Sequence, residues 1–198
     1  NGYPKSICTS VNHVVCHGIP SNKILDEGDI INIDITVILN GWHGDSSRMY
    51  IVGNSTSIKA KKLINTTYKS MMEGIKQIKP GSTLGDIGYT IQRIAYKNNF
   101  SIIKDFCGHG IGKQFHEPPS VLHFGNKGEG LELKEGMIFT IEPMLNIGTN
   151  EVKILEDGWT VVTKDKKLSA QFEHTIGVTK GGYKIFTLSP KKYEKPPY

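Results

Sequence analysis

The chain has 198 residues, of which 37% are hydrophobic and 22% are charged. This length suits one domain or two small halves, and the apolar content excludes a disordered protein. No apolar run approaches the roughly 18 residues of a membrane-spanning helix. The three cysteines show no CxxC spacing, which disfavours a zinc finger and favours a reducing compartment. We therefore expect a cytoplasmic protein.

The net charge of +5 comes almost entirely from lysine. Arg48 and Arg93 are the only arginines. Base edges and phosphates are usually read by the forked guanidinium group of arginine, and the lysines fall in short groups typical of a solvated surface. We expect a monomer that binds neither a specific nucleic acid nor a membrane.

Residues 29–39 (DIINIDITVIL) alternate apolar and polar side chains, which predicts a β-strand. Asn40-Gly41 follows, and this dipeptide is a strong signal for a two-residue hairpin turn. Residues 42–52 are then the returning strand.

The pattern changes to helical spacing over residues 57–79, where Pro80-Gly81 should end a first helix, and over residues 84–98. Residues 107–112 form a glycine-rich sequence that we expect to be a loop. Further strands are expected at 101–103, 137–142, 152–155, 159–163 and 170–178. This order predicts an α+β fold with a curved, largely antiparallel sheet and helices on one face.

The hairpin places two carboxylates together. If Asn40 and Gly41 form the turn, Thr36 lies opposite Asp45, and Asp34 shares their face of the sheet. Two adjacent carboxylates repel each other unless one is protonated or a cation lies between them. The hairpin alone leaves two interpretations open, a pair of solvated acids or half of a metal site.

Later segments favour the metal site. Glu142 ends an apolar strand, Glu173 lies within another, and His109 lies in the sequence GHGIG. Acids in apolar strands are costly to bury unless they are paired or bound to metal. Four carboxylates with one imidazole suit Mn, Fe(II), Co or Zn, and such a set can bridge two ions.

Six motifs in order resemble the methionine aminopeptidases over nearly the whole chain. The motifs are CHGIP at 16–20, NIDITVILNGWHGDSSRMY at 32–50, GHGIG at 108–112, FHEPP at 115–119, TIEPM at 140–144 and SAQFEHT at 169–175. The resemblance implies the pita-bread fold, with residues 1–198 as a single catalytic domain of two related halves, about 1–95 and 96–198. Glu142 and Glu173 are only 31 positions apart, which resembles the first type of this family, found in bacteria and organelles.

The resemblance also assigns residues to roles. It implies that two divalent ions are held by five ligands, of which Asp45 and Glu173 bridge: Asp34, Asp45, His109, Glu142 and Glu173. It implies that His17 and His116 contact the substrate and act in catalysis with Glu142. It assigns the methionine pocket to Tyr3, Cys8, Phe115 and Trp159. It places a monovalent cation at Asn12, Val14 and Ser169.

The implied reaction is removal of the N-terminal methionine from nascent proteins and peptides by a metal-activated hydroxide. The partners would be nascent polypeptide N-termini, encountered at the ribosome. Two alternatives remain: a proline-directed aminopeptidase of the same fold, and a non-catalytic relative that only binds nucleic acid or protein. The family carries helices and a strand ahead of the sequence NGYP, so we also expect the N-terminal part of the first half to be missing from this chain.

Overall fold

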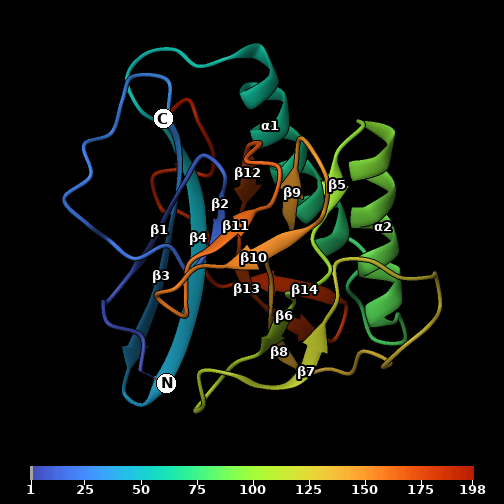
Figure 1. Cartoon of the computed structure of the whole chain (residues 1–198). Coiled ribbons are helices and arrows are strands. Elements are labelled where there is room, and N and C mark those ends of the chain that lie inside the picture. Colours follow the sequence, from blue (N-terminus) through green and yellow to red (C-terminus); the bar gives the residue numbers. More distant parts are fainter. Residues whose placement is uncertain (1) are drawn as a thin grey trace.

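A long β-hairpin forms one side of the protein in the computed structural model, which describes residues 2–198 (Figure 1). Strands β3 (Ile30–Leu39) and β4 (Trp42–Ile51) pair with Leu39 opposite Trp42 and Thr36 opposite Asp45, as predicted. Asn40 and Gly41 have φ values of 51° and 80°. Two successive residues in the left-handed region make the turn whose twist matches that of the strands. The predicted hairpin and its register are confirmed.

Both predicted helices are present, α1 (Ile58–Ile75) and α2 (Leu84–Lys97). The Ser57 side chain caps the first, and a reciprocal capping box between Thr83 and Asp86 begins the second. The expected end of the first helix at residue 79 is wrong. After Ile75 the backbone N–H groups of residues 77 and 78 donate to carbonyl oxygens only three residues back, at 74 and 75, as in a 3₁₀ turn.

The strands are antiparallel throughout the sheets described for residues 2–198. The sheet orders are β1-β3-β4, β10-β11-β2, β12-β9-β5 and β14-β13-β8-β6-β7. In Figure 1 the hairpin lies at the left and α2 at the right, while α1 packs against β9 and β12. A core of buried aliphatic and aromatic side chains joins the helices to the sheets, and its largest members include Met71, Ile87, Phe139 and Phe172.

The remaining strands are short. They are β1 (Cys8–Val11), β2 (Val14–Cys16), β5 (Ser101–Ile102), β6 (Gly108–Gly110), β7 (Glu117–Val121), β8 (Ile138–Ile141), β9 (Met144–Asn146), β10 (Val152–Ile154), β11 (Val161–Thr163), β12 (Ser169–Gln171), β13 (His174–Thr179) and β14 (Gly182–Ile185). Sequence patterns did not indicate β1, β2, β7, β9 or β14, because runs of three to five residues show too little periodicity.

The expectation of a loop at residues 107–112 is wrong at its centre, since Gly108–Gly110 is strand β6 between β7 and β8. A Cβ atom on Gly108 would lie 2.3 Å from the carbonyl oxygen of Thr140, and one on Gly110 would lie 2.1 Å from that of Pro118. The glycines therefore serve close packing of neighbouring backbones rather than a turn.

The single strand expected at 170–178 is also wrong, because it divides into β12 and β13 at Phe172 and Glu173. At the division Glu173 leaves both sheets and exchanges backbone hydrogen bonds with Ser47 of β4, at 3.1 and 3.4 Å. This bridge brings the hairpin against the C-terminal part of the chain.

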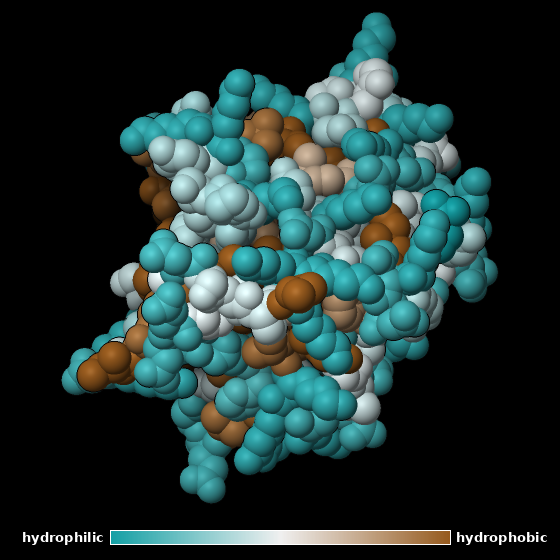
Figure 2. Space-filling model, turned by 90° about the horizontal axis from the view of Figure 1, so that it is seen from above, coloured by the Kyte–Doolittle hydropathy of each residue, from teal (hydrophilic) through white to brown (hydrophobic). Residues whose placement is uncertain are grey.

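The surface seen in Figure 2 is mainly hydrophilic, with apolar side chains in separate small groups. Within residues 2–198, neither helix combines the length and the apolar content needed to cross a bilayer.

The hairpin turn gives a first prediction. Gly41→Ala should lower the free energy of unfolding by about 1 kcal/mol, because a Cβ atom is disfavoured at its φ of 80° although the space around it is open. Gly181→Ala is the matched control, since Gly181 also has open space but has no positive φ. Urea unfolding of both variants measures the difference. Equal stabilities would show that the turn conformation is not what requires glycine at position 41.

Candidate metal centre and substrate pocket

Most of the predicted site residues surround one cavity of about 470 Å³. All five predicted metal ligands line it, together with both predicted histidines and all four residues of the expected methionine pocket: Asp34, Asp45, His109, Glu142, Glu173, His17, His116, Tyr3, Cys8, Phe115 and Trp159. The structure thus brings together residues that the sequence separates by up to 170 positions.

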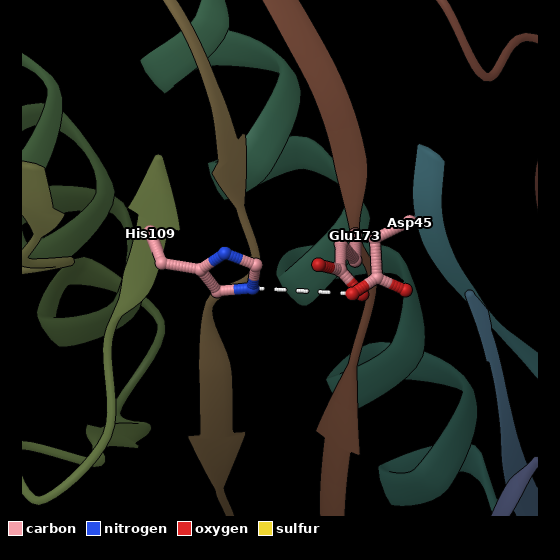
Figure 3. Close-up of side chains that lie close together, drawn as sticks. All are labelled: Asp45, His109 and Glu173. Atoms are coloured by element: carbon pink, nitrogen blue, oxygen red, sulfur yellow. Dashed lines mark ion pairs between the residues drawn. The ribbon is translucent and has the colours of Figure 1, made fainter. Parts of the chain in front are cut away.

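Three of the expected ligands converge most closely. One ligand atom from each of Asp45, His109 and Glu173 lies within 4.8 Å of the others. Figure 3 shows the two carboxylates side by side, facing the imidazole of His109 on β6. The distance from His109 Nε2 to Asp45 Oδ2 is 3.9 Å. This spacing leaves room for an ion among atoms of the types that bind divalent metals.

Glu142 and Asp34 complete the group. Glu142 directly follows β8, and its Oε1 lies 3.7 Å from His109 Nε2. Asp34 projects from β3 opposite Ser47, on the face that also carries Thr36 and Asp45, as the hairpin register predicted. The expected ligands therefore come from β3, β4, β6 and the chain around β8 and β13.

Neighbouring polar groups fix the orientation of Asp45. The Thr36 hydroxyl donates to Asp45 Oδ1 at 2.9 Å. The Thr175 hydroxyl accepts from the backbone N–H of Asp45 at 2.9 Å and donates to its carbonyl oxygen at 2.8 Å. Asp45 Oδ2 is left to face His109 (Figure 3).

Glu142 is held in the same manner. The Thr140 hydroxyl donates to Oε1 at 2.8 Å, and the side-chain amide of Gln171 donates to Oε2 at 3.3 Å. Thr140 also accepts from the backbone N–H of His109 at 3.0 Å, so one hydroxyl links two of the expected ligands.

The electrostatics of the cluster require a cation or protons. Burial raises the pKa of Asp34 to about 8, with a further contribution from the charge of Asp45, and burial likewise raises the pKa of Asp45, Glu142 and Glu173. In the described part of the chain, none of these carboxylates pairs with lysine or arginine. Burial also lowers the pKa of His109, which favours the neutral imidazole that a metal ion binds. The donor set therefore fits divalent metal ions.

The two expected substrate histidines lie in the same cavity. The ring of His116 lies 4.2 Å from that of His109 and 3.9 Å from that of Phe115, measured between centroids. His17 adopts a positive φ of 55° and makes edge contacts with Phe106 and Trp159. Burial lowers the pKa of both histidines, so each offers a neutral N–H donor and a lone pair at pH 7.

A mostly apolar wall lies beside these histidines. Tyr3 packs edge-on against Trp159 with 5.2 Å between ring centroids, and its hydroxyl donates to the carbonyl oxygen of Gly18 at 2.9 Å. Burial raises the pKa of the Cys8 thiol to about 11, so Cys8 lines the wall as an uncharged group. Cys107, which the sequence did not assign to the pocket, lines it too.

The expected monovalent-cation residues lie apart from this cavity but close to one another. Ser169 donates its backbone N–H to the carbonyl oxygen of Asn12 at 2.9 Å, and β2, which begins at Val14, lies against β12, which begins at Ser169. The Ser169 hydroxyl is buried and has no hydrogen-bond partner among the described residues.

Sequence reasoning missed the residues that orient the ligands. Thr140 and Gln171 lie inside the motifs TIEPM and SAQFEHT, but their hydrogen bonds to Glu142 are contacts that strand alternation does not reveal. His123 was missed entirely: it is 1% exposed, and burial lowers its pKa to about 3. A histidine in an otherwise apolar stretch (SVLHF) was the one available signal.

Comparison with known proteins agrees with this chemistry. Residues 1–180 match Metallopeptidase family M24. The chain belongs to metallopeptidase family M24. The methionine aminopeptidase of Rickettsia prowazekii is 63% identical over 198 residues, which are the whole of this chain and 76% of that protein. A crystal structure of the R. prowazekii enzyme superposes with a TM-score of 0.92 at 62% identity, covering 94% of this chain and 75% of that one.

Membership in family M24 makes this chain a hydrolase that depends on divalent metal ions. The fold is the pita-bread fold that sequence analysis predicted. The prolidase of Pyrococcus furiosus shares it at 24% identity and a TM-score of 0.73, with 93% of this chain and 49% of that chain covered. That resemblance extends to the fold alone.

The carboxylate cluster predicts how the stability of this M24 metallopeptidase depends on pH. Asp34 has a pKa of about 8 in the folded chain against an ordinary value of 3.8. Between these values the metal-free folded state binds more protons than the unfolded state, so its free energy of unfolding should fall as pH rises toward 8. Melting in EDTA at pH 5 and pH 8 measures this loss, and added MnCl₂ should raise Tm more at pH 8.

Asp34→Asn provides the control, because an amide has no proton to lose and the decline in EDTA should be shallower. A metal-free protein whose Tm rises between pH 5 and pH 8 would contradict the assignment of buried, unpaired carboxylates.

Proposed function

We propose that this chain removes the N-terminal methionine from proteins and peptides in a metal-dependent hydrolysis. The observation that carries the proposal is that the carboxylate and histidine cluster lines the same pocket as Tyr3, Cys8 and Trp159. In this pocket, side chains of metal-binding types occur together with a wall of aromatic rings and a thiol. Such a wall suits a flexible thioether side chain. The 63% identity to a methionine aminopeptidase supports the same substrate.

The metal would be held by Asp34, Asp45, His109, Glu142 and Glu173. We propose two divalent ions, because four carboxylates supply more charge than one ion balances, and on the family resemblance Asp45 and Glu173 would contribute to holding both. Mn, Fe(II), Co and Zn all suit this donor set. When bound, such ions lower the pKa of an attacking water and polarise the scissile carbonyl group.

Glu142 is placed to act as the general base. Its two oxygens receive hydrogen bonds from Thr140 and Gln171, which hold the carboxylate in one orientation from which it can accept a proton from the attacking water. Passing that proton to the nitrogen of the leaving amine returns Glu142 to its starting state. The fixed orientation of the carboxylate means that little reorganisation is needed during the transfer.

His116 and His17 would contact the peptide on either side of the bond that is cleaved. His116 lies beside His109, where a neutral ring N–H can donate to the oxygen that becomes negative in the transition state. His17 lies between Phe106 and Trp159 at the pocket wall, where it can hold the substrate amide. Tyr3, Cys8, Phe115 and Trp159 would enclose the methionine side chain.

Further parts of the proposal rest on the family resemblance. We propose one catalytic domain of two related halves, residues 1–95 and 96–198, that acts as a monomer on nascent N-termini at the ribosome in the cytoplasm. Its cysteines are all free, in keeping with a reducing compartment. A monovalent cation at Asn12, Val14 and Ser169 would provide a partner for the buried Ser169 hydroxyl.

The test is a paired peptide assay on metal-loaded protein. Met-Ala-Ser should be cleaved to free methionine, while Ala-Pro-Ser should be cleaved far more slowly. EDTA should abolish the activity, and MnCl₂ or CoCl₂ should restore it. Preferential cleavage of Ala-Pro-Ser would instead support a proline-directed peptidase, and metal binding without cleavage of either peptide would support a non-catalytic relative.

Replacing one histidine separates metal binding from catalysis. His116→Ala should keep its metal content but lower kcat on Met-Ala-Ser by about 10²–10³-fold, because it removes a donor to the developing oxyanion. His13→Ala is the control, since His13 lies outside this cavity. Metal analysis and steady-state kinetics give both quantities. Full turnover by the His116 variant would refute the role assigned to it.

A further inference from the structure

His123 is a buried histidine that the proposed reaction does not use. It lies two residues beyond the end of β7 at Val121 and does not line the substrate cavity. Only 1% of its surface is exposed. Histidine is rarely buried so fully without a specific partner, since each ring nitrogen loses its hydrogen bonds to water.

The partner of His123 is the backbone of Glu142. The N–H of Glu142 donates to His123 Nε2 at 3.0 Å. A ring nitrogen that accepts this bond must carry a lone pair, so the imidazole is neutral with its proton on Nδ1. The contact links residues 19 positions apart in the sequence.

The strand geometry explains why Glu142 needs an acceptor from outside the sheet. Strand β8 ends at Ile141, whose partner in the register is His174, and the next residue after Glu142 is a proline with no N–H. The backbone N–H of Glu142 therefore lies just beyond the last paired residues of β8 and β13. A buried N–H without an acceptor is costly, and a backbone that moved to find one would carry the carboxylate with it.

The segment that carries His123 is itself packed tightly on helix α2. A Cβ atom on Gly88 would lie 2.4 Å from the carbonyl oxygen of Phe124 and 2.8 Å from that of Leu122. The backbone on both sides of His123 is thus in direct contact with the helix at a residue without a side chain. The backbone that carries the imidazole is therefore held close to helix α2.

We propose that His123 is a positioning residue for Glu142, fixing the backbone from which this carboxylate reaches the metal centre. Thr140 and Gln171 orient the two carboxylate oxygens, and His123 orients the peptide group that precedes the side chain. Together the three contacts fix the backbone N–H and both carboxylate oxygens of Glu142. The inference rests on the proposed function in assigning Glu142 as ligand and base.

The experiment compares two substitutions of similar volume. His123→Gln keeps an acceptor oxygen near the place of Nε2, whereas His123→Leu fills the space without one. Loss of a hydrogen bond to a metal-binding group typically costs 10–100-fold in metal affinity or activity. We expect His123→Leu to lose 10–100-fold in both Co(II) affinity and kcat on Met-Ala-Ser, with little change in KM, and His123→Gln to recover most of each.

Two readouts keep this inference separate from the proposed function. Co(II) titration of the metal-free protein, followed by calorimetry and by the visible absorption of bound Co(II), tests the position of Glu142 whatever the substrate. If the wild-type chain binds Co(II) but cleaves no methionine peptide, the proposed function fails and the titration still decides the role of His123.

Thr67→Val controls for stability, because Thr67 is a buried hydroxyl of α1 that bonds only within its own helix, to Leu63. It should lower Tm without altering Co(II) affinity or kcat. Equal Co(II) affinity and kcat in His123→Leu and wild type, or equal losses in the Leu and Gln variants, would overturn the proposal. If His123→Leu does not fold, His123→Asn replaces it, because the shorter amide cannot reach the Glu142 N–H. Equal Co(II) affinity and kcat in the Asn and Gln variants would then overturn the proposal.

Discussion

Mutual repulsion among four carboxylates, two of them buried and two partly buried, is the constraint on which the rest of the site depends. Asp34, Asp45, Glu142 and Glu173 line one cavity without a lysine or arginine partner among the described residues. Ionised together in a low-dielectric interior they repel strongly, and protonated they cannot bind a metal ion. Thr36 donates to Asp45, and Thr140 and Gln171 donate to Glu142, while divalent cations would balance the remaining charge.

The fold meets this constraint by joining segments that are distant in sequence. The bridge between Ser47 and Glu173 connects the hairpin to the C-terminal strands, and Thr175 binds both backbone groups of Asp45 across the same junction. Each contact closes a loop of more than 100 residues, so the cluster forms only when the chain is fully folded. A metal ion bound by these residues would therefore also stabilise the fold.

The features that could be predicted from the sequence are those that depend on interactions between residues close together in the chain. The Asn40-Gly41 turn fixed a register, and that register placed Asp34, Thr36 and Asp45 correctly because hairpin pairing is local. The break at Phe172 and the strand at Gly108–Gly110 escaped prediction because they depend on contacts with Ser47, Thr140 and Pro118. His123 escaped for the same reason, since its partner lies across the sheet. The histidines of the pocket were assigned only through the family resemblance.

The preference for one substrate side chain must come from residues other than the expected metal ligands. A prolidase shares this fold at 24% identity, so the fold by itself does not select methionine. The residues of the pocket wall come from elements that contribute no ligand: Tyr3 and Cys8 from the start of the chain, and Trp159 from the turn between β10 and β11. Tyr3 and Trp159 lie outside the strands, so their side chains can change without altering a strand that carries an expected ligand. On the proposed assignment, the wall would determine which side chain is bound, and the cluster would determine which bond is cleaved.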